Sequence, residues 1–87
     1  QEMSVDIMNP TGVAFDRNGQ LFVSNRADGE VCRVTREEEA ITYSTDLGIA
    51  TGIAFDKNGV MFVGDRRGFI FKVSGFGIPE NFATLEP

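Results

Sequence analysis

An internal repeat constrains the fold of this chain more than any other feature of the sequence. Residues 11–26 return 40 residues later as residues 51–66, and ten of the sixteen aligned pairs are identical. Most of the remaining pairs exchange similar side chains, such as Val13 for Ile53. A deletion in the following loop shortens the spacing to 39 residues. A repeat near this length, made of short strands, is typical of propeller blades. The sequence therefore predicts two blades.

Each repeat contains four short segments with the hydrophobicity of strands, and none with that of a helix. Apolar content falls from the first segment to the last, which predicts an inner strand buried on both faces and an outer strand that faces water. The predicted fold is all-β, with two four-stranded antiparallel blades. Blade 1 spans about 11–48 and blade 2 about 51–87, and residues 1–8 resemble the outer strand of an adjacent blade. The expected strands are 12–15, 21–23, 30–35, 40–45, 52–55, 61–63, 69–73 and 81–85.

The two Asp-x-Asn-Gly sequences predict tight hairpin turns after the first strand of each blade. Glycine supplies the positive φ that such turns need. Asp16 and Asp56 precede these turns, but the spacing lacks the remaining ligands of a calcium loop. We therefore expect both carboxylates to stabilise their turns rather than to bind calcium.

Charge and composition exclude several classes of function. The net charge is −5, whereas nucleic-acid binding requires clustered Lys and Arg, so we expect no nucleic-acid partner. No apolar run has membrane-spanning length and no signal peptide is visible, so we expect no membrane partner and leave the compartment open. The chain has no His, which removes the commonest general base, and its lone Cys32 is interpreted as a half-buried strand residue.

The repeated pattern Thr-Gly-Val/Ile-Ala-Phe-Asp-x-Asn-Gly-x-Leu/Met-Phe-Val-x-Asn/Asp resembles the NHL-repeat family of β-propellers. It is also similar to the SMP-30/gluconolactonase and strictosidine-synthase-like propellers. The resemblance covers nearly the whole chain as two blades. It implies a six-bladed or similar ring, of which this sequence supplies two blades.

Two blades alone leave apolar faces exposed on both sides, because closed propellers need roughly 4–8 blades. The ring is completed either by homotrimerisation or by sequence outside this chain. We expect self-association into a closed propeller, since an isolated slice is difficult to keep soluble. The phenylalanines that recur with the strands are predicted to pack between blades: Phe15, Phe22, Phe55, Phe62, Phe69 and Phe71.

In propellers that this chain resembles, two sets of loops build the ligand face: those that enter the inner strand, and those that join the second and third strands. Arginines in these loops are suited to an anionic ligand, which they bind through bidentate contacts, or to local ion pairs with Asp28 or Asp65. Asn25 and Asp65 end the second strands and are also expected to accept backbone N–H bonds. The candidate ligand-binding residues are Thr11, Asn25, Arg26, Thr51, Asp65, Arg66 and Arg67.

The resemblance also bears on metal binding. Lactonases of the SMP-30 type place an Asn or Asp metal ligand immediately before the Gly that opens an inner strand, where this chain has Thr11 and Thr51. Neutral hydroxyls are poor ligands for a hard divalent ion. We therefore expect no metal, no cofactor and no catalytic residue, and predict a non-enzymatic binding scaffold for a small-molecule or protein ligand. The alternative is a metal-dependent hydrolase (lactonase) that uses Ca²⁺ or Zn²⁺.

Overall fold

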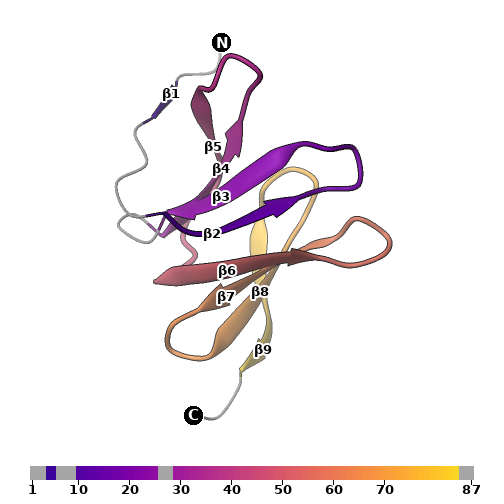
Figure 1. Cartoon of the computed structure of the whole chain (residues 1–87). Helices are drawn as coiled ribbons and strands as arrows, with labels where there is room; N and C mark the ends of the chain where they lie inside the picture. The colour runs from indigo at the N-terminus through magenta and orange to yellow at the C-terminus, as the bar shows by residue number, and fades with distance from the viewer. Residues whose placement is uncertain (1–3, 6–9, 26–28, 85–87) are drawn as a thin grey trace.

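A computed structural model describes residues 4–5, 10–25 and 29–84, which form nine strands in two antiparallel sheets and contain no helix (Figure 1). In the first sheet the strand order is β1-β5-β4-β3-β2, and in the second it is β6-β7-β8-β9. The strands are β1 (Ser4–Val5), β2 (Pro10–Phe15), β3 (Leu21–Asn25), β4 (Glu30–Val34), β5 (Ala40–Ser44), β6 (Ala50–Phe55), β7 (Met61–Asp65), β8 (Phe69–Val73) and β9 (Pro79–Thr84).

The two sheets confirm the predicted fold class, since each contains a four-stranded antiparallel meander. The inner strands β2 and β6 begin at Pro10 and Ala50, and each carries a register shift just before its glycine, Gly12 or Gly52. The sequence repeat is thus reproduced down to an irregularity of the backbone. No stretch of the described residues forms a helix of the length and hydropathy needed to span a membrane.

Only two residues of the N-terminal segment, predicted as the outer strand of an adjacent blade, are described, so that assignment stays a prediction. The two described residues, Ser4 and Val5, pair with Ile41 and Ala40 of β5 and so add a fifth strand to the first sheet. The reason is that the outer edge of β5 presents unpaired backbone N–H and C=O groups, which an extended segment satisfies. The rest of the segment, residues 1–3 and 6–9, lies outside the described residues.

The two hairpin turns are built as the sequence predicts. Asp16 accepts backbone N–H bonds from Asn18 (2.9 Å) and Gln20 (2.8 Å) through one carboxylate oxygen. Asp56 makes the same pair of bonds two and four residues further along the chain, both at 2.9 Å. Gly19 and Gly59 have φ values of 82° and 84°, in the left-handed region that favours glycine. Both aspartates therefore stabilise their turns.

The hydrophobic core lies between the two sheets, where β2 and β6 run side by side (Figure 1). Phe22 of β3 is its central aromatic residue. Its ring centroid lies 5.0 Å from that of Tyr43, in an edge-on arrangement, and 5.5 Å from that of Phe55 of the other sheet. Phe22 and Phe55 therefore pack between blades, as predicted. The buried core residues are Phe22, Val31, Leu47, Ala50, Met61, Val63 and Val73.

The inner strand of the first blade departs from the prediction that both its faces are buried. Val13 is 63% exposed and Phe15 is 66% exposed. Their equivalents in blade 2, Ile53 and Phe55, pack against the core because blade 1 covers them. No part of the described chain covers the corresponding face of blade 1. The burial of an inner strand thus depends on the neighbouring blade.

The contacts of three other side chains also bear on the sequence predictions. The ring of Phe62 contacts Phe82 on the far side of the second sheet, with centroids 5.0 Å apart, so its predicted packing against a neighbouring blade stays a prediction. Phe69 lies beneath the guanidinium of Arg67, 5.0 Å from the ring centroid. Cys32 is fully buried rather than half-buried.

Candidate functional site

The described candidate residues lie at one end of the two sheets. In the strand register Pro10 is opposite Asn25 and Ala50 is opposite Asp65, so the start of each inner strand meets the end of the second strand. Thr11 and Thr51 follow directly after these inner positions. The β7–β8 turn, which contains Arg66 and Arg67, lies at the same end. Arg26 lies outside the described residues, as does Asp28, its expected ion-pair partner.

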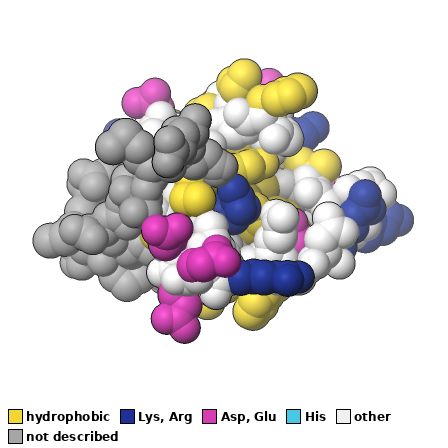
Figure 2. Space-filling model, turned by 90° about the horizontal axis from the view of Figure 1, so that it is seen from above, with side chains coloured by type: hydrophobic (Ala, Val, Ile, Leu, Met, Phe, Trp, Pro, Cys, Tyr) yellow, Lys and Arg dark blue, Asp and Glu magenta, His cyan; other side chains and the backbone are white. Residues whose placement is uncertain are grey.

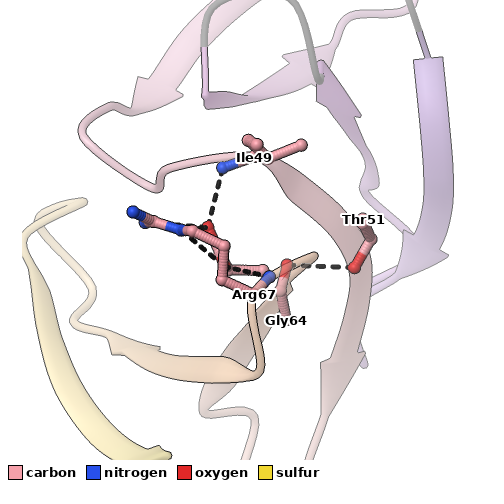
Figure 3. A network of polar contacts seen from close by, with 5 residues as sticks. Ile49, Thr51, Gly64 and Arg67 are labelled. Atoms are coloured by element: carbon pink, nitrogen blue, oxygen red, sulfur yellow. Dashed lines mark hydrogen bonds and ion pairs between the residues drawn. The ribbon is translucent and has the colours of Figure 1, made fainter. Parts of the chain in front are cut away.

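Asp65 is the centre of a polar network in the second blade, whose donors Ile49 and Arg67 are labelled in Figure 3. Its buried carboxylate accepts backbone N–H bonds from Ile49 (2.7 Å) and Arg67 (2.6 Å). The Arg67 side chain adds bonds from Nε at 3.1 Å and from Nη2 at 3.1 Å. The predicted role of Asp65 as a backbone acceptor is confirmed, and Arg67 forms the local ion pair that was the alternative to ligand binding.

The surroundings of Asp65 favour its ionised form. Burial by itself raises the pKa of the carboxyl, but the side-chain hydrogen bonds of Arg67, the backbone N–H groups of Ile49 and Arg67, and the charge of Arg67 outweigh it. The pKa of Asp65 is therefore below its ordinary value. The backbone of Gly48 also lies close to the Asp65 carboxylate. A Cβ at this residue would collide with that carboxylate, so the arrangement requires glycine.

The hydroxyl groups of both candidate threonines are engaged within the fold. Thr11 Oγ1 donates to the backbone oxygen of Ala50 at 2.8 Å and lies 3.0 Å from Ser24 Oγ. Thr51 Oγ1 donates to the backbone oxygen of Gly64 at 3.2 Å (Figure 3). The first bond joins the two sheets and the second joins β6 to β7. The two hydroxyl hydrogens are therefore both directed at backbone oxygens of the fold.

Asn25 shows that the two blades use the same position differently. Its side-chain nitrogen donates to Glu30 Oε1 at 3.1 Å, whereas the equivalent Asp65 accepts bonds from Arg67. Thr42 donates to the other oxygen of Glu30, also at 3.1 Å. Sequence reasoning missed Glu30, which is 7% exposed. The available signal was the repeat itself, which places this carboxylate where blade 2 has Phe69.

Arg66 is the candidate most accessible to a ligand. Its backbone N–H donates to the carbonyl of Ile49 at 2.9 Å, which fixes the start of the turn. Its side chain is exposed, and no ion pair with it occurs in the part of the chain that the structure describes. The neighbouring Arg67 is oriented by Asp65. The turn therefore presents one anchored and one accessible guanidinium.

A cleft of about 590 Å³ between the sheets opens at the opposite end, among the hairpin turns. Tyr43 lines it, and its hydroxyl donates to the carbonyl of Ser74 at 3.2 Å. Burial first, and the charge of Asp16 second, raise the pKa of Tyr43. Side chains of both charge signs line the cleft, among them Arg33 and Glu80. Sequence reasoning missed this cleft because it exists only where the two sheets meet.

Comparison with known proteins identifies the fold. No protein-family model matches the sequence, and no curated protein matches it. A solved structure of selenomethionine-substituted virginiamycin B lyase from Staphylococcus aureus is similar, with a TM-score of 0.75 and 13% identity, over 100% of this chain and 31% of that one. A streptogramin B lyase structure is similar, with a TM-score of 0.76 and 12% identity, over 99% of this chain and 30% of that one.

These similarities define the fold. Both neighbours are β-propeller proteins, so the two sheets are propeller blades. The chain spans about 30% of the length of these neighbours. At such low identity the likeness concerns the fold alone. The NHL-repeat subfamily and the six-bladed ring stay predictions from the sequence.

Proposed function

We propose that this chain is a non-enzymatic propeller scaffold that binds an anionic ligand. The site lies at the end of the sheets where the inner strands begin and the β7–β8 turn is placed. The observation that carries the proposal is the accessible guanidinium of Arg66 beside the anchored guanidinium of Arg67. Guanidinium groups bind carboxylate and phosphate in a planar, bidentate geometry. The ligand class is therefore a small molecule or protein segment that carries a carboxylate or a phosphate group.

The roles of the other candidates support this assignment. Asp65 orients Arg67 and is itself buried, so it contributes to the site as a positioning residue. Thr11 and Thr51 use their hydroxyl groups to hold the strands. Figure 2 shows basic, acidic and hydrophobic side chains near one another on the described part of one face, and no broad basic surface of the kind that nucleic-acid binding needs.

The test uses phosphate and succinate as probes of the two anion classes. We expect either probe, added at constant ionic strength, to shift the amide NMR signals of Arg66 and Arg67. Arg66→Glu should weaken this binding by about tenfold or more, because a hydrogen bond to a charged group contributes roughly 1.5–3 kcal/mol. Chemical-shift titrations of the labelled chain and of the variant measure the change.

Arg36→Glu is the matched control, because it makes the same charge change at an exposed arginine of the β4–β5 turn. Binding that is unaltered in this variant and lost in Arg66→Glu supports the proposed site. Equal losses in the two variants would mean that only the net charge matters. An absence of shifts at residues 65–68 with both probes would refute an anion site in the turn.

The second candidate function is an enzyme, and one finding favours it: both solved neighbours are lyases. Its test is incubation of the chain with virginiamycin B, followed by mass spectrometry of the antibiotic. The scaffold assignment predicts that the antibiotic is recovered unchanged. Conversion of many antibiotic molecules per added chain would replace the scaffold with the enzyme.

A further inference from the structure

Each blade has one apolar face that no other blade covers in the described chain. On blade 1 this surface is the outer face of β2, with Val13 and Phe15 exposed at 63% and 66%. On blade 2 it is the face of the second sheet turned away from blade 1, where Phe82 is 59% exposed and contacts Phe62. We call these the β2 face and the β9 face.

The contact between the two blades within the chain specifies what fits these faces. Phe22 contacts Tyr43 of its own sheet and Phe55 of the next. In the repeat, Phe62 is equivalent to Phe22 and Phe82 is equivalent to Tyr43. Phe62 and Phe82 make the same edge-on pair, at the same centroid distance of 5.0 Å. The third member of the set, equivalent to Phe55, is Phe15 of the β2 face. The β9 face thus repeats the surface on which a β2 face would dock.

The glycines of the inner strands point to the same contact. A Cβ at Gly12 would lie 2.6 Å from the backbone oxygen of Thr51, so the close approach of blade 2 requires glycine there. Gly52 is the equivalent residue, yet a Cβ at Gly52 would have no atom within 4 Å. Nothing in the described chain requires glycine at this position. A further blade that approaches β6 as β6 approaches β2 would require it.

The hydrogen bond between the blades involves one of two equivalent threonines. Thr11 Oγ1 donates to the carbonyl of Ala50 in the next blade. Thr51 is the equivalent residue on the inner strand of blade 2, where its hydroxyl donates to the carbonyl of Gly64 in its own sheet. In a docked copy, the carbonyl of Pro10 would take the place that the carbonyl of Ala50 has beside Thr11. The phenylalanines and the glycines therefore repeat an interface that the described chain forms once, and the two threonines occupy equivalent places in it.

We propose that copies of this chain associate head to tail, with the β2 face of one copy docked on the β9 face of the next. The contact is heterologous, and such contacts form a closed ring when their rotation closes. Three copies give six blades, within the range of about 4–8 in closed propellers. The chain covers 31% of one solved neighbour and 30% of the other, so three copies also come near their length.

Absolute mass by light scattering, coupled to size exclusion, tests the assembly. The full chain of 9.5 kDa is expected to elute with three times that mass. Phe15→Asp and Phe62→Asp each introduce a charge into one face and should each reduce the mass to that of a single chain. Phe76→Asp is the control and should keep the wild-type mass, because Phe76 is 92% exposed in the β8–β9 turn and lies on neither face.

A mixture of the two disrupted variants tests the head-to-tail arrangement. The Phe62→Asp chain retains an intact β2 face and the Phe15→Asp chain retains an intact β9 face. An equimolar mixture should therefore give a two-chain species, while each variant alone stays a single chain. A symmetric contact between identical faces would not produce this result.

Gly52→Ala separates docking from folding. In the isolated chain the new methyl group meets nothing, so circular dichroism should be unchanged, while the mass should fall to one chain. Gly12→Ala, the matched variant, should disturb the fold itself. A wild-type chain that stays monomeric, or a Gly52→Ala chain that retains the wild-type mass, would overturn the proposal. A mass of two or four chains would overturn the threefold closure.

Discussion

Replacing Phe22 with alanine is expected to lower the free energy of unfolding by about 3–5 kcal/mol, the usual cost of removing a buried aromatic ring. Phe22 is 3% exposed and its ring contacts both Tyr43 and Phe55. Its removal leaves a cavity in the core that joins the blades. A loss of this size is a large fraction of the stability of a small domain. Urea denaturation followed by circular dichroism measures it.

Phe76→Ala is the matched control for Phe22→Ala. The same ring is removed from a turn where it is 92% exposed, so the free energy of unfolding should change by no more than about 0.5 kcal/mol. If both variants lost the same stability, the two sheets would not share the core described here. If neither did, Phe22 would not be buried in solution.

Replacing Asp65 with asparagine is expected to lower the free energy of unfolding by about 1–3 kcal/mol at neutral pH. The carboxylate accepts bonds from Ile49 N–H, from Arg67 N–H and from the Arg67 side chain. An amide offers one acceptor oxygen in place of two and carries no charge. The network that joins the β7–β8 turn to the start of β6 would therefore be left with unpaired donors.

The pH dependence of this loss has a defined direction. Because the folded chain holds the pKa of Asp65 below its ordinary value, ionised Asp65 stabilises the fold fully above the unfolded value of about 3.9. This stabilisation is lost as the pH falls through the lower folded pKa. The difference in unfolding free energy between wild type and Asp65→Asn should therefore be largest near pH 7 and shrink below pH ~4. Urea titrations across this range measure it.

Asp46→Asn is the control for the pH experiment. It makes the same chemical change at an exposed turn residue whose φ of 62° is well tolerated by asparagine. Its unfolding free energy should stay within about 0.5 kcal/mol of wild type. A difference between wild type and Asp65→Asn that is constant from pH 7 to the acid range would contradict the role of the Asp65 charge.

The proposed assembly affects how the proposed binding residues are arranged. Head-to-tail copies would bring the β7–β8 turn of every chain to the same face of the propeller, so Arg66 would recur around one opening. The two proposals nevertheless rest on separate residues. Phe15 and Phe62 lie on the sheet faces and Arg66 lies in a turn, so either proposal can fail without the other.

The local structure of this chain could be predicted from its sequence. The 40-residue repeat predicted two blades, because each copy carries the same alternation of apolar strands and turn residues. Asp16 and Asp56 could be assigned to their turns, since an Asp that opens such a turn accepts hydrogen bonds from backbone N–H groups two and four residues later. Asp65 as a backbone acceptor was likewise predictable, because one of its donors, Arg67 N–H, is only two residues further along the chain.

The candidate site was predictable only in outline. The sequence placed the loops at one end of the sheets, but not which arginine would be engaged: Arg67 pairs with Asp65, while Arg66 is exposed. It did not indicate the buried Glu30 or the cleft at Tyr43. These features depend on contacts between strands that are distant in sequence, and hydrophobic periodicity carries no information about them.

Burial is what the tertiary structure alone decided. Phe15 and Phe55 occupy the same place in the repeat, yet Phe15 is 66% exposed and Phe55 packs against the core. The same is true of Gly52 and Gly12, of which only Gly12 meets a neighbouring backbone. The sequence by itself determined the blade, because strands and turns follow from local patterns. Which faces of a blade are covered is a property of its neighbours, and it required the two sheets to be placed in space.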